Sequence, residues 1–567
     1  MAKEIIHYDV RKIRDIKDLV NSSAEIYQNK AAYLVKNSMR EYEEVSFNQA
    51  KNNMDELGTA LINLGLKGEK IAVIGENRYE WAISYLAVIC GTGIVVPLDR
   101  MLPENEIESC LKRGEVTAVI YSDRVKDEIM NISERLDNVK YFIGMDLKEE
   151  VGKFKSLELL LKRGRTLLDE GNRDFLDAEI DVNEVAEILF TSGTTSESKA
   201  VMLSHNNLAF NIMNQCSMLY IDDKDIFLSI LPIHHVYECV CGFLTPFYRG
   251  CTVAYCEGLK YIQKNMQEAK VTMMLGVPLI FETMYRKIWK EIEKQGKEKL
   301  VKSMIKITNA LGPVGKKMKK KVFKSIYDQF GGNIRLFIAG AAAINPEVSK
   351  GFKDFGILAL QGYGLSECAP IVALNPNTCP KDDAAGLPLF NTDVKIVDKN
   401  KEGVGEIVTK GEHVMLGYYK DENATKEVMK DGYFYTGDLG YLDEEGYVHI
   451  TGRKKNVIIT KNGKNVYPEE IEGLLNDLPY VKETMVYGKK EKNDILLSVQ
   501  VLVDKDKIKE EKGDISEEQV KDIIWSEIKK VNEGLVQYKR IKNLELRDKE
   551  FEKTTTMKIK RYKENVN

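Results

Sequence analysis

Helix patterns alternate with short apolar strand patterns in the first part of the chain, and this alternation limits the fold more than any other feature. An apolar pattern with helical spacing begins after Ser46, which can form a capping box with Gln49, and ends near Gly65, a residue suited to a left-handed stop. The apolar run 71–75 that follows has the pattern of a buried strand. The same succession continues with a helix at about 78–90, a strand at 95–99, a helix from about residue 104 and a strand at 117–121. Because strands joined by helices pair in parallel, we predict a parallel sheet with helices on both faces.

The alternation returns after Asp181, and different patterns follow it. Strand patterns at 186–190, 225–231 and 251–256, with a helix pattern at 236–248, predict a second α/β half without a residue-level repeat of the first. From Val394, short alternating runs with Gly and Asp turns predict hairpins, and strand patterns at 481–488 and 495–503 with a helix after Ser516 predict a compact α+β segment. We therefore predict an α/β fold with two domains. The large N-terminal domain, residues 1–453, has two αβ-layered sheets and a small β region, and the small mobile C-terminal α+β domain spans 454–567.

Length and composition agree with a globular protein of several domains. The 567 residues are too many for one ordinary core, and 43% hydrophobic with 30% charged residues is typical of globular chains. The first residues lack the apolar region and cleavage site of a secretory signal. The longest apolar run, Ile83 to Leu98, is shorter than a membrane span, and Gly91 and Gly93 interrupt it. We interpret it as helix, turn and buried strand, and we expect a cytoplasmic protein.

Cysteine and histidine spacing argues against a dedicated metal site. The nine cysteines are an odd number, none forms a C-x-x-C pair, and most lie in apolar context, as reduced thiols do. The six histidines include no H-E-x-x-H spacing. Disulfides and structural zinc are therefore not expected, and any metal should arrive with a phosphate group.

Positive charge is concentrated in one segment. The net charge is −4, but Arg286 to Lys324 holds fourteen Lys or Arg against three Glu, a local charge of +11. One interpretation is a solvated helix surface; the others are attraction to an anionic membrane surface or to a phosphorylated ligand. Nucleic acid is disfavoured because no zinc finger, basic zipper or RNP-type aromatic pattern accompanies the segment.

A strand pattern leads into a turn of small and hydroxylated residues at Leu189 to His205. The turn offers hydroxyls and unhindered amides, and a lysine follows it: Thr191, Ser192, Gly193, Thr194, Thr195 and Lys199. Such donor density suits a phosphate. The stretch is not a Walker A loop, because G-x-x-x-x-G-K-[ST] is absent. Taken alone, an ordinary turn stays the alternative interpretation.

Three further stretches carry groups that suit a nucleotide. In 361–370, glycines flank Tyr363, whose ring could stack on a purine, and Ser366 and Glu367 supply the hard oxygens that Mg²⁺ needs; the alternative is an aromatic turn with a surface acid. In 433–472, Asp438 in a T-G-D-L turn and Arg453 suit ribose hydroxyls. In the tail, Lys558 between apolar neighbours is either positioned or simply solvated.

Taken in order along the chain, these motifs resemble a known family. They are TSGTTSESK, LPIHHVYE, GAAA, YGLSE, YTGD, GRKKNVI and TTTMKIKR, and they cover nearly the whole chain. They are similar to the ANL superfamily of acyl-AMP-forming enzymes. The LPIHHVYE and TMKIKR motifs and the Lys-rich segment are most similar to the long-chain fatty acyl-CoA synthetases.

The resemblance implies a nucleotide site. Thr191, Ser192, Gly193, Thr194, Thr195 and Lys199 would hold the β and γ phosphates of ATP. Tyr363, followed by Gly364, would stack on adenine near Gly340 and Ala341. Ser366 and Glu367 would hold the α-phosphate and Mg²⁺, and Asp438 with Arg453 would bind the ribose.

The resemblance also implies roles in the reaction. His235 matches the family's histidine beside the acyl and CoA passage; a histidine that is satisfied at a helix start is the alternative. Lys455 matches the hinge of the small domain, and Lys461 lies in the stretch that would turn toward CoA. Lys558 matches the adenylating lysine, so the expected catalytic set is Lys558, Glu367, Thr191 and His235.

The phosphate loop departs from the family pattern at three positions. The family's glycine, proline and glycine are Ser196, Ser198 and Ala200 here, so the loop has less freedom at positive φ. The donors themselves are retained. Met557 replaces the glycine of many short-acid relatives, as the long-chain group also does.

These expectations combine into one reaction with open alternatives. A fatty acid carboxylate would attack the α-phosphorus of MgATP to give acyl-AMP, and CoA would then displace AMP. An acyl carrier protein as acceptor, an aromatic or branched acid, and a non-catalytic ATP or acyl-CoA binder stay open. Peripheral contact with an anionic membrane through Arg286 to Lys324 is a further expectation, and no motif fixes the chain length of the acid or the oligomeric state.

Overall fold

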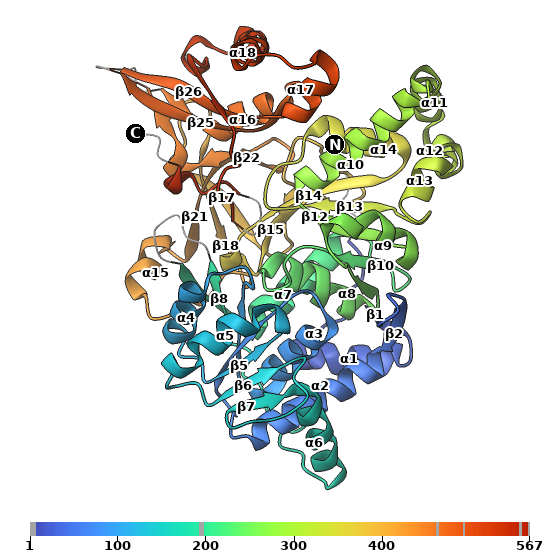
Figure 1. Cartoon of the computed structure of the whole chain (residues 1–567), viewed down its shortest axis with the longest axis vertical. Coiled ribbons are helices and arrows are strands. Elements are labelled where there is room, and N and C mark those ends of the chain that lie inside the picture. Colours follow the sequence, from blue (N-terminus) through green and yellow to red (C-terminus); the bar gives the residue numbers. More distant parts are fainter. Residues whose placement is uncertain (1–6, 192–197, 461–463, 492–493, 555–557, 565–567) are drawn as a thin grey trace. The chain divides into compact units, whose positions relative to one another are not determined.

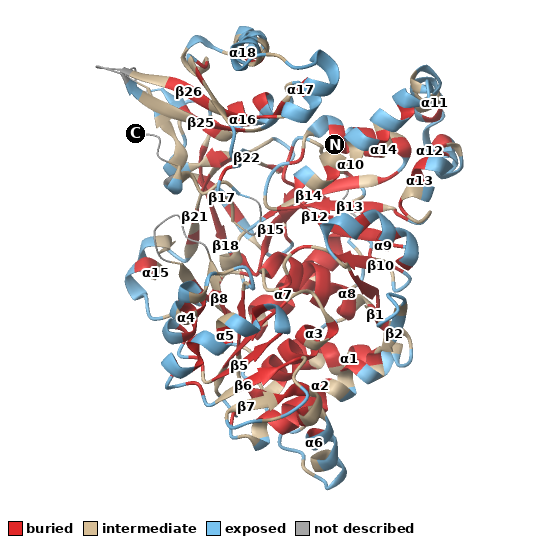
Figure 2. Cartoon of the chain, viewed as in Figure 1, coloured by how far each residue is buried: buried red, intermediate tan, exposed pale blue. Residues whose placement is uncertain are grey.

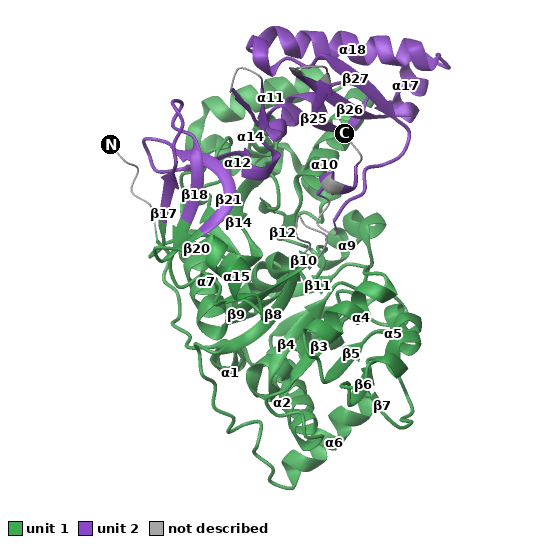
Figure 3. Ribbon diagram, turned by 90° about the vertical axis from the view of Figure 1, so that its left-hand side faces the viewer, with its two compact units in different colours: residues 1–393, 409–434 green, residues 394–408, 435–567 purple. Residues whose placement is uncertain are grey.

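A computed structural model of the chain describes residues 7–191, 198–460, 464–491, 494–554 and 558–564 (Figure 1). Strands and helices alternate through most of it, and the buried residues gather in the strands and on the helix faces packed against them (Figure 2). The chain divides into two compact units (Figure 3). Unit 1 contains Met1–Asp393 and Thr409–Phe434, and unit 2 contains Val394–Val408 and Tyr435–Asn567.

The first sheet of unit 1 has eight strands in the order β19-β9-β8-β4-β3-β5-β6-β7. They are β3 (Lys70–Ile74), β4 (Ile94–Leu98), β5 (Ala118–Tyr121), β6 (Tyr141–Gly144), β7 (Phe154–Ser156), β8 (Val185–Thr191), β9 (Lys199–Ser204) and β19 (Gly417–Tyr418). Strands β3 to β8 pair in parallel, as the alternation predicts. Strands β9 and β19, for which the alternation predicts no direction, pair antiparallel at one end of this sheet. The segment 192–198 between β8 and β9 is too short for the crossover that a parallel pair needs.

Helices join these strands, and three of them lie where the apolar spacing predicts: α2 (Phe47–Asn63), α3 (Tyr79–Ala87) and α4 (Glu104–Arg113). Two more, α5 (Lys126–Ile132) and α6 (Leu157–Asp169), follow further along the chain. Helix α2 starts at the predicted capping box of Ser46 and Gln49. The run Ile83 to Leu98 is helix α3, a π-helical turn η1 (Val88–Thr92) and the buried strand β4, so that prediction is confirmed. Gly91, at φ 149°, lies at the turn.

The second sheet of unit 1 has nine strands in the order β16-β15-β14-β13-β12-β10-β11-β1-β2. They are β1 (Ala31–Lys36), β2 (Tyr42–Ser46), β10 (Ile226–Ser229), β11 (Thr252–Tyr255), β12 (Met273–Gly276), β13 (Leu336–Ala339), β14 (Leu358–Gly364), β15 (Ile371–Leu374) and β16 (Leu387–Pro388). The strands from β14 to β1 pair in parallel, and β2, β15 and β16 pair antiparallel at the two edges.

Helices also join and flank the second sheet. They are α1 (Ile16–Tyr27), α7 (His205–Met218), α8 (Thr245–Arg249), α9 (Ile262–Ala269), α10 (Pro278–Lys294), α11 (Glu298–Ala310), α12 (Gly312–Val322), α13 (Lys324–Gln329) and α14 (Pro346–Phe355). Helix α15 (Glu422–Val428) instead follows β19 of the first sheet. The predicted helix at 236–248 is a π-helix η4 (Tyr237–Leu244) continued by α8.

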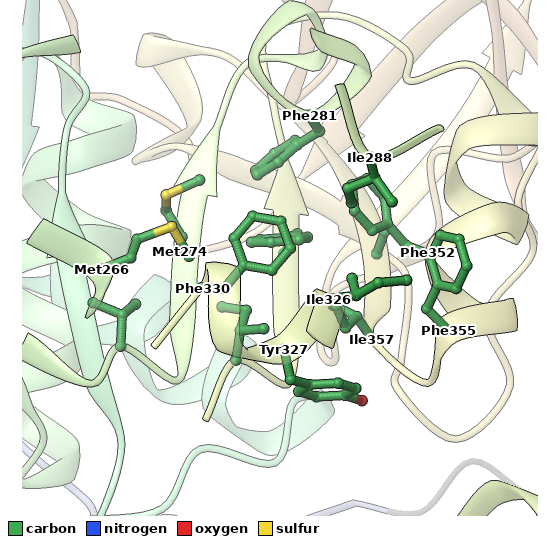
Figure 4. Close-up of a cluster of buried hydrophobic side chains, with 14 of the residues drawn as sticks. Met266, Met274, Phe281, Ile288, Ile326, Tyr327, Phe330, Phe352, Phe355 and Ile357 are labelled. Carbon is green, nitrogen blue, oxygen red and sulfur yellow. The ribbon is translucent and has the colours of Figure 1, made fainter. Parts of the chain in front are cut away.

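An apolar core lies between the second sheet and helices α9, α10, α13 and α14. Figure 4 shows Phe281 and Ile288 of α10, Phe352 and Phe355 of α14, and Met274 of β12 in this cluster. Phe281 and Phe337 have ring centroids 4.9 Å apart. This core fixes the helices behind the sheet and leaves the carboxyl ends of β12, β13 and β14 to carry loops.

Unit 2 combines a small β region with an α+β segment. Most of a five-stranded sheet belongs to this unit: β17 (Asp393–Val397), β18 (Gly405–Lys410), β21 (Tyr433–Leu442) and β22 (Val448–Arg453). Its short strand β20 (Met429–Lys430) belongs to the residues of unit 1. The rest contains β23 (Ile458–Ile459), β24 (Asn465–Val466), β25 (Val481–Glu491), β26 (Asp494–Val503), β27 (Asn543–Arg547), α16 (Pro468–Asn476), α17 (Lys505–Lys512) and α18 (Glu517–Gly534). The predicted hairpins, strands and the Ser516 cap are confirmed. The domain boundary at 453/454 stays a prediction.

Eight of the nine cysteines are buried, and Cys256 is half-buried, so they pack as small apolar side chains. Within the described ranges, no helix has both the length and the apolar character needed to cross a bilayer.

Candidate active site

Two strands hold the ends of the predicted phosphate loop opposite each other. Thr191 ends β8 and Lys199 begins β9, and the two residues are partners in the antiparallel register. The Thr191 hydroxyl donates to the Lys199 carbonyl oxygen at 3.3 Å. Ser192, Gly193, Thr194 and Thr195 lie outside the described residues. The hairpin therefore places a hydroxyl and an ammonium group at the two ends of the loop.

Two of the three departures from the family pattern are accommodated locally. Arg113 of α4 donates to the Ser198 hydroxyl at 3.2 Å and to its carbonyl oxygen at 2.5 Å. Ala200 lies inside β9, where the backbone is extended, and its carbonyl oxygen accepts from the Tyr419 amide at 2.8 Å. An alanine methyl is compatible with extended backbone. Ser196 lies outside the described residues.

Tyr418 connects two of the predicted site residues. Its hydroxyl donates to Glu367 Oε1 at 2.9 Å, and Lys199 Nζ lies 4.5 Å from the centre of its ring. The Glu367 carbonyl oxygen also accepts from the Met415 amide at 2.8 Å. Antiparallel pairing of β19 with β9 brings Tyr418 beside Val201, close to Lys199. Sequence reasoning missed Tyr418, because only this pairing between distant segments reveals its role.

Glu367 and Ser366 lie in a short 3₁₀ turn, η6 (Ser366–Cys368), directly after β14. The carboxylate and the hydroxyls of Ser366 and Thr191 are hard oxygen donors, the type that Mg²⁺ prefers with a bound phosphate. The chemistry of these donors therefore fits Mg²⁺, and the role of Glu367 as a metal ligand stays a prediction.

The residues predicted to bind adenine lie at the carboxyl ends of two neighbouring strands of the second sheet. Gly340 and Ala341 follow β13, and Tyr363 and Gly364 end β14, its parallel neighbour. A Cβ on Gly340 would lie 2.6 Å from the Tyr237 ring, so only glycine fits there. Ala341 is in the left-handed region at φ 71°. Tyr363 itself is buried, with 7% exposure.

His235 precedes the π-helix η4. Its Nδ1 accepts from the Tyr237 amide at 3.2 Å, which is a contact expected of a histidine at a helix start. Its neighbour His234 lies 3.8 Å from Asp99, next to the end of β4, and burial lowers the pKa of His234. The segment between β10 and η4, which carries both histidines, thus lies where the carboxyl ends of strands from both sheets of unit 1 meet. The role of His235 in the acyl passage stays a prediction.

In unit 2, the predicted ribose pair is formed. Asp438 of β21 and Arg453 of β22 are partners in the antiparallel register, and Arg453 Nε lies 2.8 Å from Asp438 Oδ1. Arg453 also donates to the Thr436 carbonyl oxygen at 3.3 Å. Gly437, between Thr436 and Asp438, has a left-handed backbone with φ 70°. The ion pair therefore holds the Asp438 carboxylate on strand β21, directly after a residue whose backbone conformation favours glycine.

Lys455, the predicted hinge, lies in a 3₁₀ turn, η7 (Lys454–Asn456), directly after β22. Burial, and then the positive charge of Arg453, lowers the pKa of Lys455 to about 8. Its neighbour Lys454 pairs with Glu406 at 2.7 Å. Lys461 lies outside the described residues.

The tail that carries Lys558 is anchored within unit 2. The Thr554 amide donates to the Lys558 carbonyl oxygen at 2.8 Å, and the Lys558 amide donates to the Thr554 hydroxyl at 3.1 Å. Arg561 then donates to Glu472 at 2.5 Å and to the Val486 carbonyl oxygen at 2.9 Å. These contacts favour a positioned Lys558. Sequence reasoning missed the Arg561–Glu472 anchor, although Arg561 belongs to the quoted KIKR motif.

The fold and these groups define a class before any relative is considered. A hydroxyl, a lysine and a carboxylate near the ends of β8, β9 and β14, together with an Asp–Arg pair and an anchored lysine in the other unit, are groups that suit transfer of an adenylyl group to a carboxylate. The class is that of adenylate-forming ligases. Residues 20–419 match the family described as AMP-binding enzyme, and residues 455–565 match the AMP-binding enzyme C-terminal domain, so the chain belongs to this family, the ANL superfamily.

Relatives differ in the acid and in the acceptor that their names state. The long-chain-fatty-acid–CoA ligase of Rattus norvegicus is 28% identical over 84% of this chain and 75% of its own length. The chloroplastic long-chain-fatty-acid–[acyl-carrier-protein] ligase of Arabidopsis thaliana is 25% identical over 91% of this chain and 80% of its own. The crystal structure of the anthranilate CoA ligase AuaEII with anthranoyl-AMP superposes with a TM-score of 0.77 at 18% identity, over 98% and 96% of the two chains. The chain is thus an AMP-forming acid–thiol ligase by family, and these relatives do not agree on one acid.

Proposed function

We propose that the protein activates a long-chain fatty acid with ATP to acyl-AMP and pyrophosphate and then transfers the acyl group to CoA. The observation that carries the proposal is the contact of Glu367 and Lys199 through Tyr418 beside the β8–β9 turn. It gives one place where a carboxylate that suits a cation and a lysine that suits a phosphate are held together. The name of the Rattus norvegicus relative supports a long-chain acid.

Adenylation needs alignment and charge compensation more than acid–base chemistry. A carboxylate oxygen of the fatty acid forms a bond to the α-phosphorus of ATP, and the bond from that phosphorus to the β-phosphate oxygen breaks, releasing pyrophosphate. The carboxylate is already a nucleophile, so no general base is required. Lys199 and the hydroxyls from Thr191 to Thr195 hold the phosphates, and Lys558 compensates charge on the reacting group.

Mg²⁺, held by Glu367, supplies positive charge to the phosphates when bound. Tyr418 keeps the Glu367 carboxylate in place through its hydroxyl. Asp438 and Arg453 take the ribose, and Tyr363 with Gly340, Ala341 and Gly364 receives the adenine, so these residues orient the nucleoside part of ATP.

In the second step, the CoA thiolate attacks the acyl carbonyl carbon and AMP leaves. We place His235 beside the passage for these substrates, and Lys461 in the face that turns toward CoA. The small domain, 454–567, turns about Lys455 between the steps, removing Lys558 from the nucleotide. A cytoplasmic location with peripheral contact at the inner face of the membrane accords with a water-insoluble acid.

An acyl carrier protein is the second candidate acceptor, because the Arabidopsis thaliana relative is named for it. The test is acid-dependent exchange of labelled pyrophosphate into ATP without CoA, over acids from acetate to oleate and benzoate. We expect exchange to peak at long chains, and thioester formation then to follow with CoA. A peak with benzoate or a short acid would overturn the long-chain assignment, and ATP binding without exchange would indicate a non-catalytic binder.

A further inference from the structure

Helices α11 and α12 expose apolar side chains that the core of unit 1 does not use. These side chains are Leu300 (54% exposed), Ile307 (59%), Leu311 (46%), Val314 (63%) and Met318 (45%). Leu300 and Ile307 lie seven residues apart on α11, and Val314 and Met318 lie four apart on α12, so each pair shares one face of its own helix. Leu311 lies at the junction of the two helices. We call these five residues and the lysines among them the α11–α12 surface.

The opposite faces of the same helices already supply the packing that holds them. Val301, Met304 and Ile305 pack against the core cluster behind the second sheet, and Thr308 is buried. On α12, Gly315 and Lys319 are the buried residues. Figure 2 shows most of α11 and α12 as exposed. The outward apolar residues are therefore not needed to fold the helices, and an exposed apolar group of this extent indicates a docking site.

Lysines surround these apolar side chains without acidic partners. Lys299, Lys306, Lys316, Lys317 and Lys321 are exposed, and none of them forms an ion pair within the part of the chain that the structure describes. Lys302 pairs only with Glu298, one turn away on the same helix. The surface thus combines uncompensated positive charge with exposed hydrocarbon.

This combination distinguishes among partners. Lysine is depleted at the core of protein–protein interfaces, so burying the surface against another protein would desolvate several ammonium groups. A nucleic acid would use the charge but leave the apolar side chains in water. An anionic bilayer accommodates both, because apolar side chains enter the acyl boundary and lysine stems extend to the phosphates.

We propose that the α11–α12 surface docks on an anionic lipid bilayer, with Ile307, Leu311 and Val314 entering the interface and the lysines contacting lipid phosphates. The proposal deepens the peripheral location given under the proposed function, and it rests on that function only for the benefit of docking, which is access to a membrane-dissolved acid.

The test is co-sedimentation of the full chain with phosphatidylcholine vesicles, with and without phosphatidylglycerol. We expect binding to the anionic vesicles alone, weakened by salt. Lys316→Gln with Lys317→Gln should weaken binding by roughly tenfold or more, because each lysine near an anionic surface contributes. Ile307→Ser with Val314→Ser should weaken it by roughly tenfold through lost apolar burial.

Matched controls use exposed residues elsewhere. Met39→Ser with Val151→Ser removes apolar groups that are more exposed still, and Lys521→Gln with Lys529→Gln removes equal charge. Both double variants should bind vesicles as the unaltered protein does. Pyrophosphate exchange with a water-soluble acid should be unchanged in every variant, which separates this proposal from the proposed function.

Several outcomes would overturn the proposal. Equal binding to neutral vesicles, no vesicle binding at all, or equal loss in the control variants would do so. Loss only in the lysine variant would overturn the entry of apolar side chains. Self-association that the Ile307→Ser, Val314→Ser variant abolishes, without vesicle binding, would show that a second copy covers the surface.

Discussion

At the scale of single residues, Tyr418 makes contacts within the candidate site that its sequence context does not reveal. Its hydroxyl donates a hydrogen bond to the Glu367 carboxylate, and the Lys199 ammonium group lies over its ring. Tyr418→Phe keeps the ring and removes the hydrogen bond to a carboxylate, so we expect pyrophosphate exchange to fall by roughly tenfold, since such a bond is worth about 1.5–3 kcal/mol. The half-saturating Mg²⁺ concentration should rise, because Glu367 is less well oriented.

The matched control is Tyr419→Phe. The Tyr419 hydroxyl donates to Glu115 at 2.6 Å, away from Glu367, so this variant should keep both parameters. A positioning role for Tyr418 requires the shift in Mg²⁺ dependence. A loss of exchange in Tyr418→Phe at unchanged Mg²⁺ dependence would indicate a merely structural role.

Lys558 provides a second prediction at this scale. Its turn is anchored by Arg561 and Glu472, and the side chain is exposed. Lys558→Ala should reduce exchange by about 10²–10³-fold, the usual loss for one group that stabilises transition-state charge. Thioester formation from preformed acyl-AMP should be little changed. Lys560→Ala, two residues away with a half-buried side chain near Glu552, should retain both half-reactions. Equal loss of both half-reactions in Lys558→Ala would contradict the role.

The residue types of the site were accessible from sequence, but their contacts were not. Thr191, Lys199 and Glu367 could be selected because hydroxyl, lysine and carboxylate groups are typical of sites that bind phosphates and cations. Tyr418 and Glu472 could not, because each acts through a partner more than 50 residues away in the sequence, brought close only by sheet pairing or tail folding.

At the scale of elements, strand β8 contains a buried acid that ties stability to pH. Glu187 is fully buried, and neither carboxylate oxygen has a hydrogen-bond partner within the described residues. Burial raises the pKa of Glu187 to about 8, and the nearby Tyr85 offsets this only in part. In the unfolded chain the pKa is about 4.3. The folded state therefore holds this carboxyl in its neutral form at pH 7.

The sign of the effect follows from these two pKa values. The stabilising contribution of Glu187 is fully present below about pH 4.3 and is lost as the pH rises to about 8, by about 1.4 kcal/mol per pH unit. Glu187→Gln removes this titrating group. The free energy of unfolding of the variant should therefore rise relative to that of the unaltered protein as the pH rises from 5 to 8. Urea unfolding midpoints at several pH values measure this difference. Glu184→Gln, an exposed position just before β8, should leave the slope unchanged.

Helices α2 to α4 and strands β3 to β5 were predictable because a local apolar period marks them, and α2 also begins at a capping box. The antiparallel strands β9 and β19 were not, since direction depends on connection length and on a partner far along the chain. The same limit applies to β15 and β16 at the edge of the second sheet.

At the scale of the whole molecule, the candidate site residues are divided between two units. Thr191, Lys199 and Glu367 belong to unit 1, whereas Asp438 and Lys558 belong to unit 2. The second family match begins at residue 455, the predicted hinge. A reaction that needs Lys558 in one step and its removal in the next requires the second part of the chain to turn.

Lys455→Pro tests this turn. Proline fixes φ near −65° and restricts the preceding residue, so it limits rotation of the chain at this point. We expect pyrophosphate exchange to be retained and thioester formation from preformed acyl-AMP to fall by roughly tenfold or more, since restriction of a hinge affects the step that follows the motion. Lys455→Ala is the matched control: it removes the same side chain but leaves φ free, and it should support both half-reactions. If Lys455→Ala lost thioester formation as Lys455→Pro did, the side chain would be responsible and the hinge would lie elsewhere. If Lys455→Pro retained both half-reactions, the turn about Lys455 would be excluded.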